Sequence, residues 1–115
     1  MNELSGSAGP AFSAGQLAGE PATAEQNPLF SIIVPTHDRP DLLAAALASV
    51  LEQTEHSWQC IVVDDASNAA AVSPDDSRFM VIRHSTPQGP AAARNAGLAA
   101  AIGQFVCFLD DDDVF

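Results

Sequence analysis

The chain is organised around the stretch Phe105-Val-Cys-Phe-Leu109, which is followed by Asp110-Asp-Asp-Asp113-Val-Phe115. Residues 105–109 are all apolar, and a short run of this kind is typical of a strand buried on both faces. Four adjacent carboxylates follow at once, and they repel one another unless a cation balances their charge. Ligands bind at the carboxyl ends of strands in open α/β sheets, and carboxylate oxygens suit Mg²⁺ or Mn²⁺. A solvated acidic turn is the alternative, but the strand leading directly into the run favours a metal site.

The segments upstream of this run alternate between strand and helix patterns. We expect strands at Phe30–Pro35, Trp58–Val63 and Phe79–Arg83, and helices at Pro40–Gln53 and from Pro90 to about Ile102, where Gly103 ends the second helix. The strands are nearly continuous apolar runs, which is typical of parallel sheets covered by helices. The sequence therefore predicts an α/β fold, with a Rossmann-like, mostly parallel sheet and flanking helices.

The domain organisation follows from composition and length. Residues 1–28 are rich in Ala, Gly, Ser, Glu and Pro, and we expect a disordered leader because they offer little apolar surface to bury. Residues 29–115 leave room for one small domain. The chain stops two residues after the acidic run, so its last strand would lack cover. We therefore expect an amino-terminal piece of a longer protein.

Net charge restricts the classes of partner. The chain has 15 acidic residues, four Arg and no Lys, for a net charge of −11. This balance argues against nucleic acid and against an anionic membrane surface as binding partners, because binding to either requires clustered basic residues.

The cysteines and the absence of targeting signals bear on the cellular compartment. Cys60 and Cys107 lie in predicted strands, and we expect buried free thiols in a reducing compartment. No signal peptide or membrane segment is visible, so we expect a cytoplasmic protein, or one held at the cytoplasmic face of a membrane by parts outside this sequence.

Four motifs in residues 29–115 together resemble those of family-2 glycosyltransferases, which have the GT-A fold. They are Ser31-Ile-Ile-Val-Pro-Thr36, Val62-Val-Asp-Asp-Ala-Ser67, Gly89-Pro-Ala-Ala-Ala-Arg-Asn-Ala-Gly97 and Phe108-Leu-Asp-Asp-Asp-Asp113. Each motif alone is weak, whereas the ordered set at this spacing is specific. The resemblance implies that residues 29–115 are the amino-terminal, nucleotide-sugar-binding half of a GT-A domain, truncated after the Asp-x-Asp motif.

The resemblance also implies where the donor, a nucleoside-diphosphate sugar, would bind. The implied nucleotide-binding residues are Pro35, Thr36, His37, Asp64, Asp65, Arg94 and Asp110. Asp65 would accept a hydrogen bond from the imide N–H of uracil or a similar base, and Arg94 would oppose the diphosphate. Asp64 has a second possible role, the capping of the loop after its strand. His37 and Asp38 depart from the Tyr and Asn that are common in the family.

The same resemblance implies a bound metal ion and an inverting reaction. Asp110 and Asp112 match the outer positions of the Asp-x-Asp motif and would bind Mn²⁺ or Mg²⁺, although Asp111 and Asp113 have the same spacing. The metal would stabilise the leaving nucleotide, and a carboxylate base would deprotonate the acceptor hydroxyl group. That base is expected downstream of Phe115, and the acceptor is an unidentified saccharide, lipid or protein.

Other classes of protein share parts of this pattern. A haloacid-dehalogenase-like phosphatase also has Asp-x-Asp after a strand, but the motif normally continues with Gly-Thr and opens the domain. A response-regulator receiver requires a Lys that this chain lacks. A non-catalytic module that binds a nucleotide or a divalent ion is the third alternative.

The remaining histidines and arginines receive plainer interpretations. We expect His56 and His84 at the surface without a role, and we expect Arg78 and Arg83 beside acidic neighbours. Arg39 is either solvated or faces a phosphate.

Overall fold

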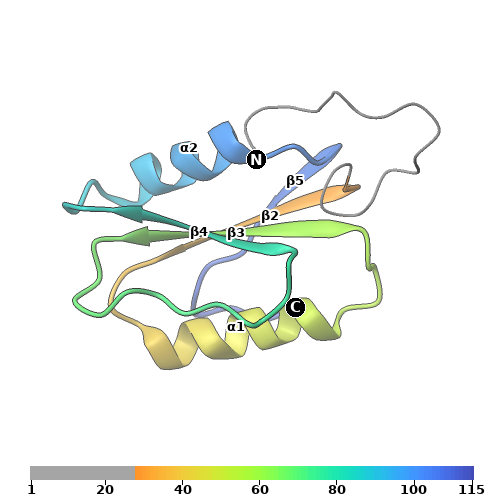
Figure 1. Cartoon of the computed structure of the whole chain (residues 1–115), viewed down its shortest axis with the longest axis horizontal. Coiled ribbons are helices and arrows are strands. Elements are labelled where there is room, and N and C mark those ends of the chain that lie inside the picture. The colour runs from red at the N-terminus through yellow and green to blue at the C-terminus, as the bar shows by residue number, and fades with distance from the viewer. Residues whose placement is uncertain (1–27) are drawn as a thin grey trace.

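The computed structural model describes residues 28–115, which form a four-stranded sheet with a helix on each face (Figure 1). The strand order is β4-β3-β2-β5, and every neighbouring pair is parallel. This arrangement confirms the predicted α/β fold. All but the last residue of the expected leader, residues 1–28, lies outside the described part. The elements are β2 (Phe30–Thr36), α1 (Pro40–Glu52), β3 (Trp58–Asp65), β4 (Phe79–His84), α2 (Pro90–Ala100) and β5 (Phe105–Phe108).

The predicted elements are all present, and their boundaries differ by at most two residues. β3 continues through Asp65 and β4 through His84, so these polar residues lie within the strands. α2 ends at Ala100 and not at Ile102, because Ala101 is already extended and its N–H bonds the carbonyl oxygen of Leu98. The strand extensions matter for the site, because they fix both polar side chains at one edge of the sheet.

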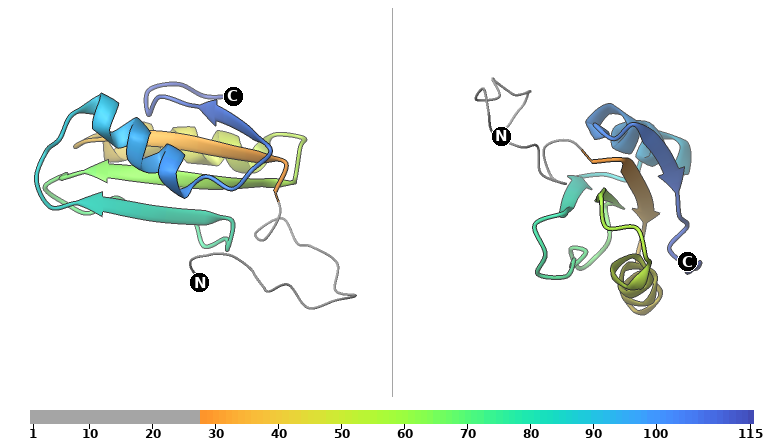
Figure 2. Two further views of the ribbon diagram at one scale, coloured as in Figure 1. Left: turned by 90° about the horizontal axis from the view of Figure 1, so that it is seen from above. Right: turned by 90° about the vertical axis from the view of Figure 1, so that its right-hand side faces the viewer.

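The two helices cover opposite faces of the sheet (Figure 2). On one face the apolar stripe of α1 packs against β2 and β3, in a core of Ile32, Val34, Leu43, Ala46, Leu47, Val50, Trp58, Cys60, Val62 and Leu109. On the other face Ala93 of α2 joins Ile33, Ile61 and Val63. A methyl group added at Gly97 would overlap the side chain of Ile33. The small residues of α2 therefore allow the helix to lie close against the sheet.

β5 is a short edge strand and is largely exposed. Phe105, Val106 and Phe108 are 55%, 42% and 46% exposed, whereas Leu109 just beyond them is 5% exposed in the α1 core. The prediction of a strand buried on both faces is therefore wrong for the described residues. An apolar run predicts a strand, but burial also depends on neighbouring elements, and both helices lie mainly over β2 and β3.

The sheet topology places the candidate site. From β2 the chain continues to β3 and β4 on one side of β2, and it later forms β5 on the other side of β2. The direction of winding therefore reverses between β2 and β5. Ligands bind outside the carboxyl ends of the strands at such a reversal. Because all four strands are parallel, the loops after them share one edge with the amino termini of α1 and α2. In the described residues, neither helix is long and apolar enough to cross a membrane.

Candidate functional site

The acidic turn after β5 has one inward-facing and three outward-facing carboxylates. Asp111 is 7% exposed, and its two oxygens accept hydrogen bonds from the Thr36 hydroxyl group at 2.9 Å and from Arg39 at 3.3 Å. The N–H of Asp113 bonds the carbonyl oxygen of Asp110 and closes the turn. Asp110, Asp112 and Asp113 are exposed. The geometry thus favours the motif frame in which Asp110 and Asp112 face a ligand.

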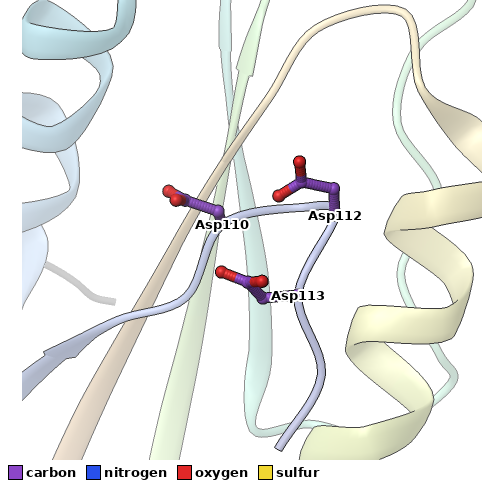
Figure 3. A group of neighbouring side chains, drawn as sticks. All are labelled: Asp110, Asp112 and Asp113. Atoms are coloured by element: carbon purple, nitrogen blue, oxygen red, sulfur yellow. The ribbon is translucent and has the colours of Figure 1, made fainter.

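The three exposed carboxylates lie close together around the turn (Figure 3). One oxygen from each of Asp110, Asp112 and Asp113 lies within 4.8 Å of the other two. Opposite oxygens around a six-coordinate Mg²⁺ are about 4.2 Å apart, so small side-chain rotations would bring these oxygens to an ion. The donor set therefore fits Mg²⁺ or Mn²⁺, and it adds Asp113 to the two ligands that the sequence predicts. Two or three protein oxygens would leave positions for phosphate and water.

Two arginines flank the acidic turn from opposite sides. Arg94 of α2 lies 3.4 Å from Asp110, measured between Nη2 and Oδ1. Arg39, the residue before α1, lies 3.3 Å from Asp111 and 3.7 Å from Asp112. The two guanidinium groups balance part of the negative charge. They also place positive charge next to the exposed carboxylates, where an anion bound to a metal ion would lie.

Asp64 is fully buried and bound by the loop that follows β3. Its oxygens accept hydrogen bonds from the N–H of Ser67 at 3.0 Å, the N–H of Ala71 at 2.8 Å and Arg83 at 2.6 Å. Burial raises the pKa of Asp64, but the bonds from Ser67, Ala71 and Arg83 outweigh it and hold the pKa below its ordinary value. Since both oxygens have internal donors, the geometry favours loop capping over nucleotide contact for Asp64.

Asp65 is held by two backbone donors at the amino terminus of α2 and by His84 at the end of β4. Its Oδ1 accepts from the N–H of Gln88 at 2.8 Å and lies 3.0 Å from Nδ1 of His84, and its Oδ2 accepts from the N–H of Gly89 at 2.9 Å. The bond from Gln88, followed by that from His84, holds the pKa of Asp65 below its ordinary value. Gly89, the residue before α2, has a φ of +95°, which only glycine adopts easily. The carboxylate is therefore ionised and fixed in orientation.

His84 contacts Asp65 and is largely buried, so the prediction of a surface residue is wrong. Its side chain is 12% exposed and lies against Asp65. The parallel pairing of β3 and β4 sets Asp65 opposite His84. A polar residue at the end of each of two neighbouring parallel strands was the sequence signal that could have indicated this contact.

The loop after β2 is tied to the loop after β3. His37 is half-exposed, and its Nδ1 lies 2.6 Å from the carbonyl oxygen of Asp65. Asp38 has a φ of +53°, its N–H bonds the Ser67 hydroxyl group, and its Oδ1 accepts from the N–H of Asn68. The Thr36 hydroxyl group donates a hydrogen bond to Asp111. Pro35 is half-buried within β2, opposite Val63. The sequence-predicted residues therefore share one edge.

Comparison with known proteins gives one family. The family described as glycosyl transferase family 2 matches residues 31–115. An uncharacterized glycosyltransferase of Haemophilus influenzae is 40% identical over 89 residues, which are 76% of this chain and 30% of that protein. The UDP-Glc:alpha-D-GlcNAc-diphosphoundecaprenol beta-1,3-glucosyltransferase WfgD of Escherichia coli is 36% identical over 91 residues, 76% of this chain and 36% of that protein.

Solved structures agree with this match. The crystal structure of S. aureus TarS 1–349 in complex with UDP-GlcNAc superimposes with a TM-score of 0.62 and 29% identity, over 74% of this chain and 27% of that one. The chain thus spans about a third or less of the length of these proteins.

Proposed function

The chain belongs to glycosyltransferase family 2, and we propose that it carries the donor and metal site of a sugar-transferring enzyme. The reaction would move a sugar from a nucleoside diphosphate to an acceptor hydroxyl group with inversion. One observation supports the proposal: Asp65 ends β3 at the same edge of the sheet as the turn after β5, where Asp110 and Asp112 are exposed and Arg94 lies 3.4 Å from Asp110. The family and the site both favour this function over a phosphatase or a binding module.

The acidic turn would hold Mn²⁺ or Mg²⁺. Asp110 and Asp112 are the proposed ligands, and Asp113 lies close enough to take part. When bound, the ion supplies charge stabilisation to the leaving diphosphate. Asp111 would keep the turn in position through Thr36, and Arg94 would add positive charge beside the diphosphate. The turn without a cation would repel a diphosphate, so binding should depend on the metal.

The nucleotide would lie along the ends of β2 and β3. Asp65 would accept a hydrogen bond from the base, and the half-exposed ring of His37 would pack on the base or donate to it. Pro35, Thr36 and Asp110 would border the ribose. WfgD is named for a UDP-Glc donor and TarS was crystallised with UDP-GlcNAc, which supports a nucleotide sugar as the donor. The carboxylate base that activates the acceptor would lie beyond Phe115, and the acceptor would be a saccharide, a lipid or a protein.

Calorimetry on the intact protein tests this proposal. UDP and GDP would each be titrated with Mn²⁺ and again with a chelator, and we expect at least about tenfold weaker binding with the chelator because the unbalanced carboxylates repel the diphosphate. Asp112→Asn should remove the dependence on Mn²⁺, whereas Asp75→Asn, at an exposed acid away from the site, should not. Equal affinity with and without metal would refute the metal role, and failure of every nucleoside diphosphate to bind would refute the donor site.

A further inference from the structure

We propose that His84 determines which base the site accepts, by restricting Asp65 to a single additional N–H donor. A base that presents one N–H at its pairing edge, uracil or thymine, would then bind in preference to guanine. The inference rests on the proposed function, which places the donor's base at Asp65. It adds a residue, and a reason for selectivity, that the family motifs do not include.

The acceptor positions of Asp65 can be counted. An ionised carboxylate has two oxygens with two lone pairs each. Oδ1 receives the N–H of Gln88 and the Nδ1 of His84, and Oδ2 receives the N–H of Gly89. Nδ1 of His84 must carry a proton, because its neighbour is an anionic oxygen that can only accept. Oδ1 is therefore full, and one lone pair is left on Oδ2.

Little of the Asp65 carboxylate is accessible to a ligand. The side chains of Asp65 and His84 are 11% and 12% exposed, so a ligand reaches only a small part of either group. On the main-chain side, Nδ1 of His37 lies 2.6 Å from the Asp65 carbonyl oxygen and fixes the backbone of the residue. Asp65 therefore cannot turn to offer both oxygens to a ligand. It offers one acceptor in one direction.

The bases differ in what they present to such an acceptor. Uracil and thymine have a single N–H, the imide, between two carbonyl oxygens. Guanine has the N1–H beside an amino group, and a carboxylate pairs with both only through two free oxygens. Next to Asp65, the guanine amino group would face the filled Oδ1 and lose its hydrogen bond. An unpaired polar group of this kind weakens binding by about tenfold or more.

The first test uses the unmodified intact protein with Mn²⁺. Calorimetry should give at least about tenfold tighter binding for UDP than for GDP. UDP methylated at N3, which lacks the imide proton, should lose a similar factor, whereas 5-methyl-UDP should bind like UDP. GDP binding as tightly as UDP, or N3-methylation without effect, would overturn the proposal. Failure of all nucleoside diphosphates to bind would instead refute the donor site itself.

The second test assigns the selectivity to His84. His84→Leu removes the donor and frees a lone pair on Oδ1, so the ratio of UDP to GDP affinity should fall about tenfold. His84→Asn keeps an N–H donor at the same distance along the side chain and should keep the ratio. His56→Leu, at an exposed histidine, is the matched control and should also keep it. A purely structural role would weaken both nucleotides equally, so an unchanged ratio in His84→Leu would overturn the proposal.

Discussion

The hydroxyl group of Thr36 donates a 2.9 Å hydrogen bond to Oδ2 of Asp111, which joins the end of β2 to the acidic turn after β5. The partners are 75 residues apart in sequence and both are buried. Arg39 reaches the other oxygen of Asp111. This contact determines which members of the Asp run face outward, because an inward Asp111 leaves Asp110 and Asp112 exposed on either side.

The roles of Asp111 and Asp112 should therefore separate in mutants. Asp111→Ala leaves the buried hydroxyl group of Thr36 without its acceptor, and we expect the free energy of unfolding to fall by about 1–3 kcal/mol. Asp112→Ala removes an exposed group, so stability should change by less than about 0.5 kcal/mol, yet metal-dependent nucleotide binding should be lost. Urea unfolding followed by the fluorescence of Trp58, the single tryptophan, measures stability. An Asp112 variant with normal metal dependence would contradict this assignment.

Ala66 should be a site of stored backbone strain. It follows Asp65 with a φ of +61°, the left-handed conformation that costs a residue with a Cβ about 1–2 kcal/mol. Ala66→Gly removes this cost at the price of greater freedom in the unfolded chain, so we expect a net gain of up to about 1 kcal/mol in the free energy of unfolding.

The matched control for Ala66 is the same substitution in a helix. Ala44 lies in the exposed part of α1, and Ala44→Gly should lower the free energy of unfolding by about 1 kcal/mol. Opposite signs for the two substitutions would confirm the strain. A loss of stability in both variants would show that Ala66 is relaxed in its loop.

Gly103 and Gly97 should differ in how much a methyl group costs. A Cβ at Gly103 would lie 2.6 Å from backbone atoms of Phe30 and Ser31, whereas one at Gly97 would meet the side chain of Ile33. A side chain can rotate away, and backbone cannot without breaking the pairing of β2. Gly97→Ala should therefore cost about 1–3 kcal/mol, and Gly103→Ala should cost more. Thermal melting of both variants measures the ranking, and equal melting temperatures would contradict it.

The sequence predicted the sheet and its helices because hydrophobic periodicity and turn residues are local signals. It also placed the acidic turn and Asp65 at one edge, since the carboxyl ends of parallel strands lie together. The resemblance favoured Asp110 with Asp112, but spacing alone could not exclude Asp111 with Asp113, because the two pairs have the same spacing. That choice depends on the contact with Thr36, which lies far away in the chain.

Two other features depended on contacts that sequence does not show. The contact of His84 with Asp65 follows from the register of β3 with β4, which aligns the two residues. A buried polar cluster links Ser31, Gln59 and the N–H groups of Ile102 and Gly103. Neither has a local motif. The exposure of β5 likewise depends on which elements lie over the strand, and not on its composition.

Acid should destabilise the protein through carboxylates that are ionised in the folded state. Two N–H groups of the Arg78 guanidinium, with the N–H of its backbone, bind Asp76, and together they lower its pKa from 3.8 to about 2. Arg78 in turn lies 3.9 Å above the ring of Trp58. A carboxyl group with a lowered pKa stabilises the folded state fully above its ordinary pKa, and this contribution is lost as the pH falls toward the folded value. The pKa values of Asp64 and Asp65 are shifted in the same direction.

Asp76→Asn should consequently make stability less dependent on pH between about 4 and 2. At neutral pH the variant should unfold at a lower urea concentration than the unmodified protein, because the ionised pair with Arg78 is gone. The difference should shrink as the pH approaches about 2, where Asp76 becomes protonated in both states. Asp75→Asn, at the exposed neighbour, controls for the loss of one negative charge. Urea midpoints from Trp58 fluorescence at several pH values measure the effect, and a difference that stays constant down to the lowest pH would show that the ion pair does not cause it.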